Sequence, residues 1–494
     1  MRPLLVRSSA ATHGRGAGVV GSWLVAVLAG CSGPATGPRV PCGIGSSCAA
    51  TQRLASLTLA PAVDTALVGD ALQITFMARD SKGNAITGIP AAYHSSDPQV
   101  ATVDSTGLIR AVGPGTTTIT IAAGGLRASS QLTVLARTVV QLSAGSDAGC
   151  LELPLGRGYC WGVDGAGQLG FTVGTTCFDS GASAGAVPCE VAPAAISGGL
   201  RFATLSTGGV HTCGLTSLGA AYCWGDNTFG ELGTNTVAAS PAPLAVSGVL
   251  RFGSITAGGA HTCGLTTDDR AFCWGSDSAG QLGDAGTVNS TTPIPVVGGG
   301  AFVALTAGFA HTCGVTAARA AFCWGSNALG QLGTGSAGDH STPVAVAGGL
   351  AFTALSAGVA HTCGIVTGGG VYCWGAYGSG TSPTPVFVSG VLAFTQVSAG
   401  GAFTCGVSGT AAYCWGIDPD GEVGNGGIGG TAVTPVRVVG GYAFQSVSAG
   451  TRHACGIVQS GQAVCWGSNL FGALGNSLQA AVRGAPVVVG TPLS

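Results

Sequence analysis

Apolar and polar residues alternate along most of this chain in short runs that glycine and proline interrupt. Leu72, Ile74 and Phe76 fall on every second position, and a turn follows at 80–84 (DSKGN). Alternation with a period of two is typical of β-strands that bury one face. From residue 137 onward, short apolar runs continue between glycine-rich turns. The pattern therefore predicts an all-β protein of many short strands.

The second part of the chain is repetitive. Cys-Trp-Gly begins at residues 160, 223, 273, 323, 373, 414 and 465, at intervals of 63, 50, 50, 50, 41 and 51 residues. Each unit contains a strand ending in Ser/Thr-x-Gly, a His-Thr-Cys strand, the Cys-Trp-Gly strand and a proline-bearing strand. Four strands in a period of about 50 residues indicate one propeller blade. Residues 137–494 are therefore predicted to form seven blades.

Three sequence blocks carry a resemblance to a known family. They are Ala-Gly-x-x-His-Thr-Cys, Cys-Trp-Gly-Ser-Asn and Gly-Gln-Leu-Gly. Over residues 137–494 the chain resembles the regulator of chromosome condensation repeat family, which implies a seven-bladed β-propeller of four-stranded blades. Ala148 and Phe403 replace the histidine in units one and six, and unit five lacks the Gly-Gln-Leu-Gly loop. Unit one also carries an insert, at 171–192.

A propeller must close on itself. The last apolar run, 485–490, matches the proline-bearing strand, and the first run, 138–143, matches the strand that normally follows it. We expect these two runs to pair and seal the ring, because closure removes exposed strand edges.

Residues 54–136 resemble the bacterial Ig-like domain family, group 2. The resemblance rests on Gly69-Asp70, Ser96-Asp97-Pro98, Val103-Asp104, Gly107-Leu108 and Pro114-Gly115. It implies a small β-sandwich, of a kind common as a spacer or adhesion module on bacterial surfaces. A fold alone says little about what such a module binds. We therefore interpret it as a spacer.

The first 30 residues have the pattern of an export signal. Arg2, Arg7 and Arg15 precede an apolar core at 18–30, which is too short to span a bilayer. The core ends in Leu-Ala-Gly before Cys31, which resembles the lipobox of bacterial lipoproteins and implies that Cys31 is lipidated. The alternative is an ordinary secretory signal cleaved nearby. Residues 31–53 are rich in Pro, Gly and Ser and predict a flexible tether.

Charge limits the possible partners. Charged residues make up 8% of the chain, its net charge is -2, and Lys82 is its only lysine. Such a surface is unsuited to phosphate, so we expect no nucleic-acid partner.

The chain has 19 cysteines, and export would place them where disulfides persist. In each unit the two cysteines lie on consecutive strands of a hairpin, equidistant from its turn, so they should face each other. Each such bond would contribute roughly 2.8 kcal/mol by the chain-entropy model. With Cys31 lipidated, the expected pairs are Cys150–Cys160, Cys213–Cys223, Cys263–Cys273, Cys313–Cys323, Cys363–Cys373, Cys405–Cys414, Cys455–Cys465, Cys177–Cys189 and Cys42–Cys48.

Zinc is a rival interpretation, since histidine and cysteine are ligand types. Free or redox-active thiols are another. However, units one and six keep both cysteines without the histidine, which favours a disulfide. We expect His211, His261, His311, His361 and His453 to be structural, bonded to neighbouring backbone near the channel. We expect Trp161, Trp224, Trp274, Trp324, Trp374, Trp415 and Trp466 to form the core between blades.

Candidate chemistry is sparse. No nucleophile elbow and no phosphate-binding loop is present in the sequence. Asp418, Asp420 and Glu422 lie close enough in sequence to be a weak calcium candidate. The alternative is that they are turn residues of the unit-six loop. No cofactor is expected.

These observations favour a non-enzymatic, lipid-anchored binding or scaffold protein of the bacterial envelope. Its expected location is the outer membrane or the cell surface. Its propeller loops would bind an envelope or extracellular protein, or a glycan, with the insert at 171–192 and the unit-six loop as first candidates. The alternative is an envelope-polymer hydrolase or lyase with a site on the propeller face. Nucleotide exchange on a small GTPase, the activity of the family's nuclear founder, fits poorly with export and the few basic residues.

Overall fold

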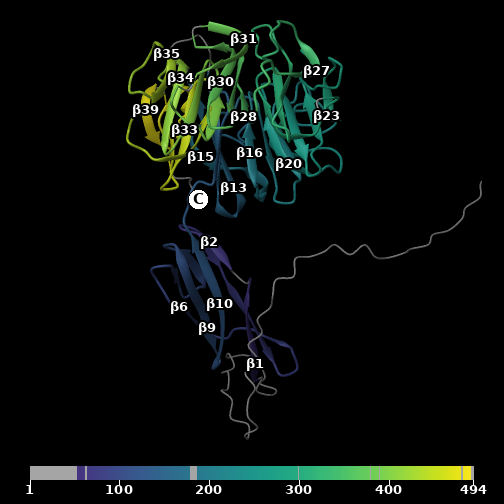
Figure 1. The fold of residues 1–494 in the computed structure, drawn as a ribbon. Coiled ribbons are helices and arrows are strands. Elements are labelled where there is room, and N and C mark those ends of the chain that lie inside the picture. The colour runs from purple at the N-terminus through teal and green to yellow at the C-terminus, as the bar shows by residue number, and fades with distance from the viewer. Residues whose placement is uncertain are drawn as a thin grey trace, which may run out of the picture. The chain divides into compact units, whose positions relative to one another are not determined.

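The computed structural model describes residues 53–490, apart from 62–63, 179–185, 299, 379, 389 and 480–481. The chain forms two compact units that meet between Leu135 and Ala136. Strands dominate both units (Figure 1). The helical elements among the described residues are three single 3-10 turns, η1 (Pro154–Gly156), η2 (Ser197–Gly199) and η3 (Leu470–Gly472). No helix in these ranges is long and apolar enough to cross a membrane.

The N-terminal unit is built from ten strands in three sheets. Its core consists of buried aliphatic residues such as Ile109, Ile119 and Leu132, which alternate with more exposed positions along their strands. The sheets are β1 (Leu54–Ala60), β4 (Thr75–Asp80) and β5 (Ala85–Ile86); β2 (Thr65–Leu67), β10 (Leu126–Leu135), β9 (Gly115–Ala123) and β6 (Ala91–Ser95); and β3 (Ala71–Gln73), β8 (Leu108–Ala111) and β7 (Ala101–Val103).

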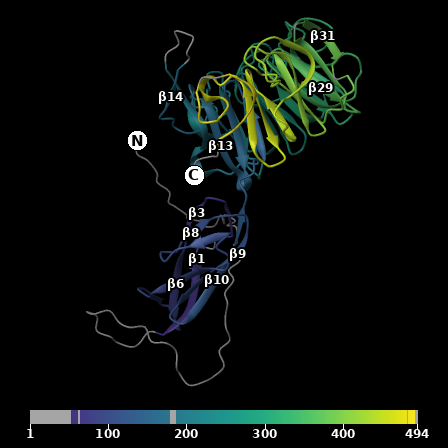
Figure 2. The same ribbon diagram turned by 90° about the vertical axis from the view of Figure 1, so that its left-hand side faces the viewer.

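The C-terminal unit contains seven antiparallel sheets, each made of strands consecutive in sequence. These are the seven blades, and blades one and five lie on opposite sides of the ring (Figure 2). In order, the strands are β11 (Gln141–Ala144), β12 (Ala148–Leu153), β13 (Arg157–Val163) and β15 (Val187–Ala195); β16 (Thr204–Thr207), β17 (His211–Leu215), β18 (Ala221–Gly225) and β19 (Ser240–Ala245); β20 (Phe252–Ala257), β21 (His261–Thr266), β22 (Ala271–Gly275) and β23 (Ser290–Pro295); β24 (Phe302–Ala307), β25 (His311–Thr316), β26 (Ala321–Gly325) and β27 (His340–Ala345); β28 (Phe352–Ala357), β29 (His361–Val366), β30 (Val371–Tyr377) and β31 (Gly380–Phe387); β32 (Gln396–Ala399), β33 (Phe403–Ser408), β34 (Ala411–Ile417) and β35 (Thr431–Arg437); β36 (Phe444–Ala449), β37 (His453–Val458), β38 (Ala463–Gly467) and β39 (Arg483–Val488).

The insert in blade one is smaller than the sequence suggested. β15, from Val187, is the fourth strand of the blade, so it belongs to the repeat. Only the segment before it is additional, and it adds the short strand β14 (Thr176–Cys177), which pairs with the beginning of β15.

The ring closes differently from our expectation. β11 is the first strand of blade one and β39 is the last strand of blade seven, and each pairs within its own sheet. The predicted pairing of these two strands is therefore wrong, because every blade is already complete in sequence order. Closure instead uses the contacts that join any two neighbouring blades, including those between the first strands β11 and β36.

The alternation of strand direction gives the propeller two distinct faces. The turn from first to second strand and the loop from third to fourth strand lie on one face, which we call the loop face. The remaining turns lie on the opposite face. Since β11 runs toward the loop face and β39 runs away from it, the chain both enters and leaves the propeller on the opposite face.

Candidate functional site

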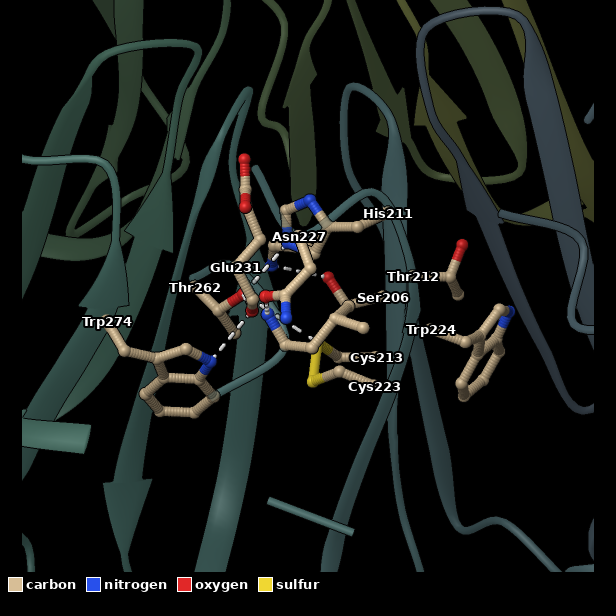
Figure 3. The surroundings of a disulfide bond; sticks show 12 residues. Ser206, His211, Thr212, Cys213, Cys223, Trp224, Asn227, Glu231, Thr262 and Trp274 are labelled. Atoms are coloured by element: carbon tan, nitrogen blue, oxygen red, sulfur yellow. Dashed lines mark hydrogen bonds between the residues drawn. A yellow bond between two sulfur atoms is a disulfide. The ribbon is translucent and has the colours of Figure 1, made fainter. Parts of the chain in front are cut away.

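The two cysteines of each repeat face each other across the second and third strands. Cys213 lies opposite Cys223 in the β17–β18 register, and the two form a disulfide with a Cα–Cα distance of 4.1 Å (Figure 3). Every blade contains the equivalent bond, and Cys177–Cys189 joins the insert to β15. With their sulfurs joined, these cysteines offer no thiolate to zinc. Cys31 and the Cys42–Cys48 pair lie outside the described residues.

A closed ring of backbone hydrogen bonds surrounds the channel. In each blade a glycine follows the first strand, and its carbonyl accepts a hydrogen bond from the residue after the equivalent glycine in the preceding blade. These bonds run from Ser146 to Gly208, Gly209 to Gly258, Gly259 to Gly308, Phe309 to Gly358, Val359 to Gly400, Gly401 to Gly450 and Thr451 to Gly145. The last of them closes the circle between blades seven and one. The ring explains why Ser/Thr-x-Gly recurs in every unit.

A second closed ring uses the serine or threonine of the same block. Its hydroxyl accepts a hydrogen bond from the backbone N–H near the end of the adjacent first strand, as between Ser206 and Ala257 at 2.9 Å. All seven junctions have this bond. The channel wall is thus made of small residues whose polar groups bond to the neighbouring blade.

The histidines bond to threonines of the next blade. His211 Nε2 lies 2.8 Å from Thr262 Oγ1, and Thr262 Oγ1 donates its proton to the Glu231 carbonyl at 3.0 Å (Figure 3). Because that proton is used, His211 must donate through Nε2–H. His261 and His311 repeat both hydrogen bonds, and His361 repeats the first one, with Thr404 Oγ1 at 2.8 Å. The expectation of a backbone partner is therefore wrong: the partner is a threonine hydroxyl.

Burial keeps these histidines neutral. Their side chains have no solvent exposure, and burial lowers the pKa of His211 to about 4. Within the described residues their Nδ1 atoms have no hydrogen-bond partner. In His453 both ring nitrogens lack one, because blade one has Gly149 where blades two to six have the threonine.

The tryptophans join each blade to the one before it. Trp274 is fully buried, and its Nε1–H donates to the same Glu231 carbonyl that accepts Thr262 (Figure 3). Its ring packs against blade-two residues, including the cystine Cys213–Cys223. Trp415 is the exception: its Nε1 has no partner among the described residues, because blade five lacks the loop that would supply the carbonyl.

The long loop from third to fourth strand is held by a pair of polar side chains. In blade four, Asn327 Oδ1 accepts from Leu332 N–H, and Gln331 Oε1 accepts from Leu329 N–H. Blades one, two, three and six have Asp or Glu at one or both positions. Burial raises the pKa of Asp164 to about 6 and of Glu422 to about 7.

The calcium candidate consists of the same loop residues in blade six. Asp418 Oδ1 accepts from Val423 N–H, and Glu422 accepts from Asp420 N–H. Asp420 forms an ion pair with Arg452 of blade seven. Backbone N–H groups and Arg452 therefore occupy these carboxylates, and no group of three His, Cys, Asp or Glu in the described ranges is placed to hold a metal ion. The turn-residue interpretation is the one that agrees with these contacts.

Exposed apolar side chains lie on both faces of the propeller: Leu218, Val249 and Val391 on the opposite face, and a second set on the loop face. Large apolar side chains are exposed there, among them Phe309 beside the channel, which is 55% exposed. Others lie on the loops from third to fourth strands: Phe178, Phe229, Val237, Val288, Leu329, Ile428 and Leu478. Sequence analysis did not single them out, because these positions vary between repeats and nothing in a single strand pattern marks them as exposed.

The repeats can now be compared with known families. Models described as Regulator of chromosome condensation (RCC1) repeat match residues 202–231, 219–265, 254–281, 302–331, 320–365 and 444–473. The chain contains RCC1 repeats. A Bacterial Ig-like domain (group 2) matches residues 55–134 in the N-terminal unit.

Solved structures share the propeller fold. Human WBSCR16 has 21% sequence identity and a TM-score of 0.60, over 68% of this chain and 94% of that chain. Prp20p from Saccharomyces cerevisiae has 20% identity and a TM-score of 0.54, over 63% of this chain and 80% of that chain. The same yeast protein in complex with Kap60 gives a TM-score of 0.55 at 20% identity, over 63% and 78% of the two chains. The RCC1 repeats and the propeller together indicate a scaffold for protein interaction.

Proposed function

We propose that this protein is a non-enzymatic binding protein of the bacterial cell envelope, anchored through a lipid on Cys31, whose loop face docks a partner protein. A glycan partner is the second possibility in the same class. The Ig-like unit would act as a spacer between the anchor and the propeller. The export signal and the lipobox-like sequence support the location, and the Ig-like domain agrees with a bacterial surface context.

The observation that carries the proposal is the presence of exposed aromatic residues on the loop face. The repeated polar side chains are used in bonds between blades, whereas Phe229, Phe309 and Leu329 face solvent. Exposed aromatic and aliphatic side chains on a rigid scaffold are the usual anchors of protein interfaces. Within the propeller, β11 begins and β39 ends on the opposite face.

The solved relatives give limited support. One structure of the yeast protein contains Kap60, and the description of another names binding to Gsp1p and histones. These partners belong to that protein. They support the view that an RCC1 propeller can act by binding other proteins, and the present chain has too few basic residues to suggest a chromatin role.

The test is a pull-down with residues 32–494, kept oxidised, against envelope extract and secreted fraction, read by mass spectrometry. The loop-face variant Phe309→Ser/Leu329→Ser is compared with a control on the opposite face, Val249→Ser/Val391→Ser, whose side chains are also exposed. We expect one dominant protein that the loop-face variant loses and the control retains. Equal loss from both variants, or no partner above background, would count against docking on this face.

A variant in which residues 178–186 are replaced by Asn-Gly tests the insert separately. It keeps the register in which Cys177 lies opposite Val187, so β15 and blade one remain intact. Loss of the partner from this variant alone would place the contact on blade one.

A further inference from the structure

Charge is divided between the two faces of the propeller. The arginines in turns or at strand ends of the opposite face are Arg137, Arg157, Arg201, Arg251, Arg270, Arg319 and Arg437, whereas the loop face has Arg452 and Arg483. Carboxyl groups follow the reverse pattern. The turns of the opposite face carry Asp268 and Asp269, and those of the loop face carry Asp147, Asp164, Asp226, Glu231, Asp277, Asp284, Asp339, Asp418, Asp420 and Glu422. The few basic residues that argued against a phosphate-binding surface are therefore gathered on one side.

Four exposed arginines form an arc over blades one to four of this face, which we call the arginine arc. Arg201 lies in the connection from blade one to blade two, and Arg251 in the next connection, each beside the turn of the preceding blade. Arg270 and Arg319 lie in the equivalent turns of blades three and four. The Arg251 carbonyl accepts from Thr267 N–H at 3.1 Å, so the connection is fixed against blade three. The arc is therefore held by the scaffold.

Carboxylates neutralise little of the arginine arc. Arg270 pairs with Asp268 at 2.9 Å. By contrast, Arg251 donates to a backbone carbonyl, and Arg319 donates to the Thr367 hydroxyl at 2.8 Å. A guanidinium stays charged and has five N–H donors, so a single bond to a neutral oxygen leaves donors for an anion. The arc is thus a positively charged surface.

Apolar side chains project from the same region. Leu218 is 82% exposed in the turn of blade two, and Val249 is 91% exposed two residues before Arg251. A pocket of about 210 Å³ lies in the same connection, and its lining includes Tyr222, Leu250 and Arg251. Aliphatic tips flanked by arginines are suited to the boundary between lipid headgroups and acyl chains. The exposed apolar residues of the loop face lie among carboxyl groups instead.

We propose that the arginine arc docks the propeller on a bilayer that contains anionic phospholipids. Arg201, Arg251 and Arg319 bind lipid phosphates, and Leu218 and Val249 enter the headgroup layer. A nucleic acid or another soluble polyanion could use the arginines, but it would give the two apolar tips no partner. Docking by this face leaves the loop face turned away from the bilayer, whatever partner that face binds.

Vesicle sedimentation of oxidised residues 32–494 tests the proposal, because this chain lacks Cys31 and so carries no lipid of its own. One set of vesicles is phosphatidylcholine alone, and the other also contains phosphatidylglycerol. We expect binding to the anionic vesicles to be at least tenfold stronger than to the neutral ones, and to weaken as salt is raised. Equal binding to both sets, or no binding to either, would overturn the proposal.

A pair of variants with the same change in charge assigns the binding to one face. Arg201→Ala/Arg251→Ala should weaken binding to the anionic vesicles roughly tenfold or more, because each surface arginine contributes to the attraction. The control Arg452→Ala/Arg483→Ala removes two arginines from the loop face and should change binding less than twofold. Equal weakening by both variants would show a response to net charge alone, against docking by the arc.

A third variant separates a bilayer from a soluble polyanion. Leu218→Ser/Val249→Ser should weaken vesicle binding at least threefold and leave retention on heparin unchanged, whereas Val391→Ser, exposed on blade five of the same face, should change neither. If the apolar variant binds vesicles like the wild type, the apolar tips do not enter a bilayer and the proposal fails. Because no protein partner is needed, this result is separate from the outcome of the pull-down.

Discussion

The Nε2 atom of His311 lies 2.9 Å from Oγ1 of Thr362 on the next blade, in a site that excludes solvent from both side chains. Blade six replaces the histidine with Phe403, and the residue across the junction is then Ala454 instead of threonine. Both of these residues are buried in one apolar cluster. The repeats therefore use two matched solutions, a polar pair at four junctions and an apolar pair between blades six and seven. The junctions of Ala148 with Thr212 and of His453 with Gly149 have neither.

These two solutions predict strong coupling between the positions. In Thr362→Ala the His311 imidazole loses its one hydrogen-bond partner among the described residues, and we expect a loss of about 1–3 kcal/mol in unfolding free energy. The double variant His311→Phe/Thr362→Ala copies blade six and should recover at least about 1 kcal/mol of the sum of the single losses. Denaturant unfolding of the oxidised chain measures this. Additive losses would show that the pair acts independently.

The buried histidines also predict acid sensitivity. Burial lowers the pKa of His211, His361 and His453 to about 4 and of His261 and His311 to about 3. The unfolded chain, with ordinary values near 6.5, binds more protons below that pH, so stability should fall as pH drops from about 6.5 toward 4. Each histidine contributes at most about 1.4 kcal/mol per pH unit.

The control is the variant His311→Phe/Thr362→Ala, which removes one of the five groups. Its unfolding free energy should fall less steeply with acid than that of the wild type. An unchanged slope would mean that His311 is protonated in the folded state.

Trp374 and Trp415 occupy the same position in two repeats and can be compared directly. Trp374 Nε1–H donates to the Gln331 carbonyl at 2.9 Å, whereas Trp415 has no acceptor in the described part of the chain. Both rings are buried. Replacement by phenylalanine removes similar volume from both sites, but only Trp374→Phe also loses a hydrogen bond. We expect Trp374→Phe to be more destabilising by about 1 kcal/mol in thermal or denaturant unfolding. A larger loss at Trp415 would contradict this account.

The disulfides predict a loss that depends little on position. Replacing Cys313 and Cys323 together with serine opens a loop of about eleven residues and should cost about 3 kcal/mol by the chain-entropy model. The same change at Cys363 and Cys373, which have the same sequence separation of 10, should cost a similar amount. Unfolding of the two double variants measures both values. A loss near zero in either would show that strand pairing alone fixes that hairpin.

The repeats made the fold predictable, because seven copies of one pattern each supply four strands and the paired cysteines. The bonds between blades were harder to foresee. His211 and Thr262 are 51 positions apart, and a single repeat does not reveal which residues meet across a junction. The sequence signal was ambiguous: units six and seven lose both residues, at Phe403 and Ala454, whereas the junctions of Ala148 with Thr212 and of His453 with Gly149 lose only one.

The closure and the loop face were beyond sequence reasoning for a different reason. A strand pattern gives the order of the strands but not the position in the repeat at which one blade ends and the next begins. The pairing of 138–143 with 485–490 placed that boundary wrongly, because each of these strands belongs to a blade that is complete in sequence order. The exposure of Phe309 follows from a turn that points out of the ring, and the alternation of apolar residues carries no information about that direction.

The glycines of the channel ring provide the sharpest prediction. Gly258 follows β20, and a Cβ added there would lie 2.5 Å from the Gly308 carbonyl oxygen and against the ring of His261. Gly253, within β20 itself, has open space, with only one backbone atom at 3.9 Å. Gly258→Ala should therefore force two blades apart and destabilise the fold by several kcal/mol, on the order of other strongly overpacked sites. Gly253→Ala should be neutral, or stabilising by up to about 1 kcal/mol, because alanine loses less backbone entropy on folding. Thermal unfolding of the two variants, which differ only in position within one blade, compares them directly. Equal stability of the two would mean that the hydrogen-bonded ring around the channel tolerates a methyl group and does not set the distance between blades.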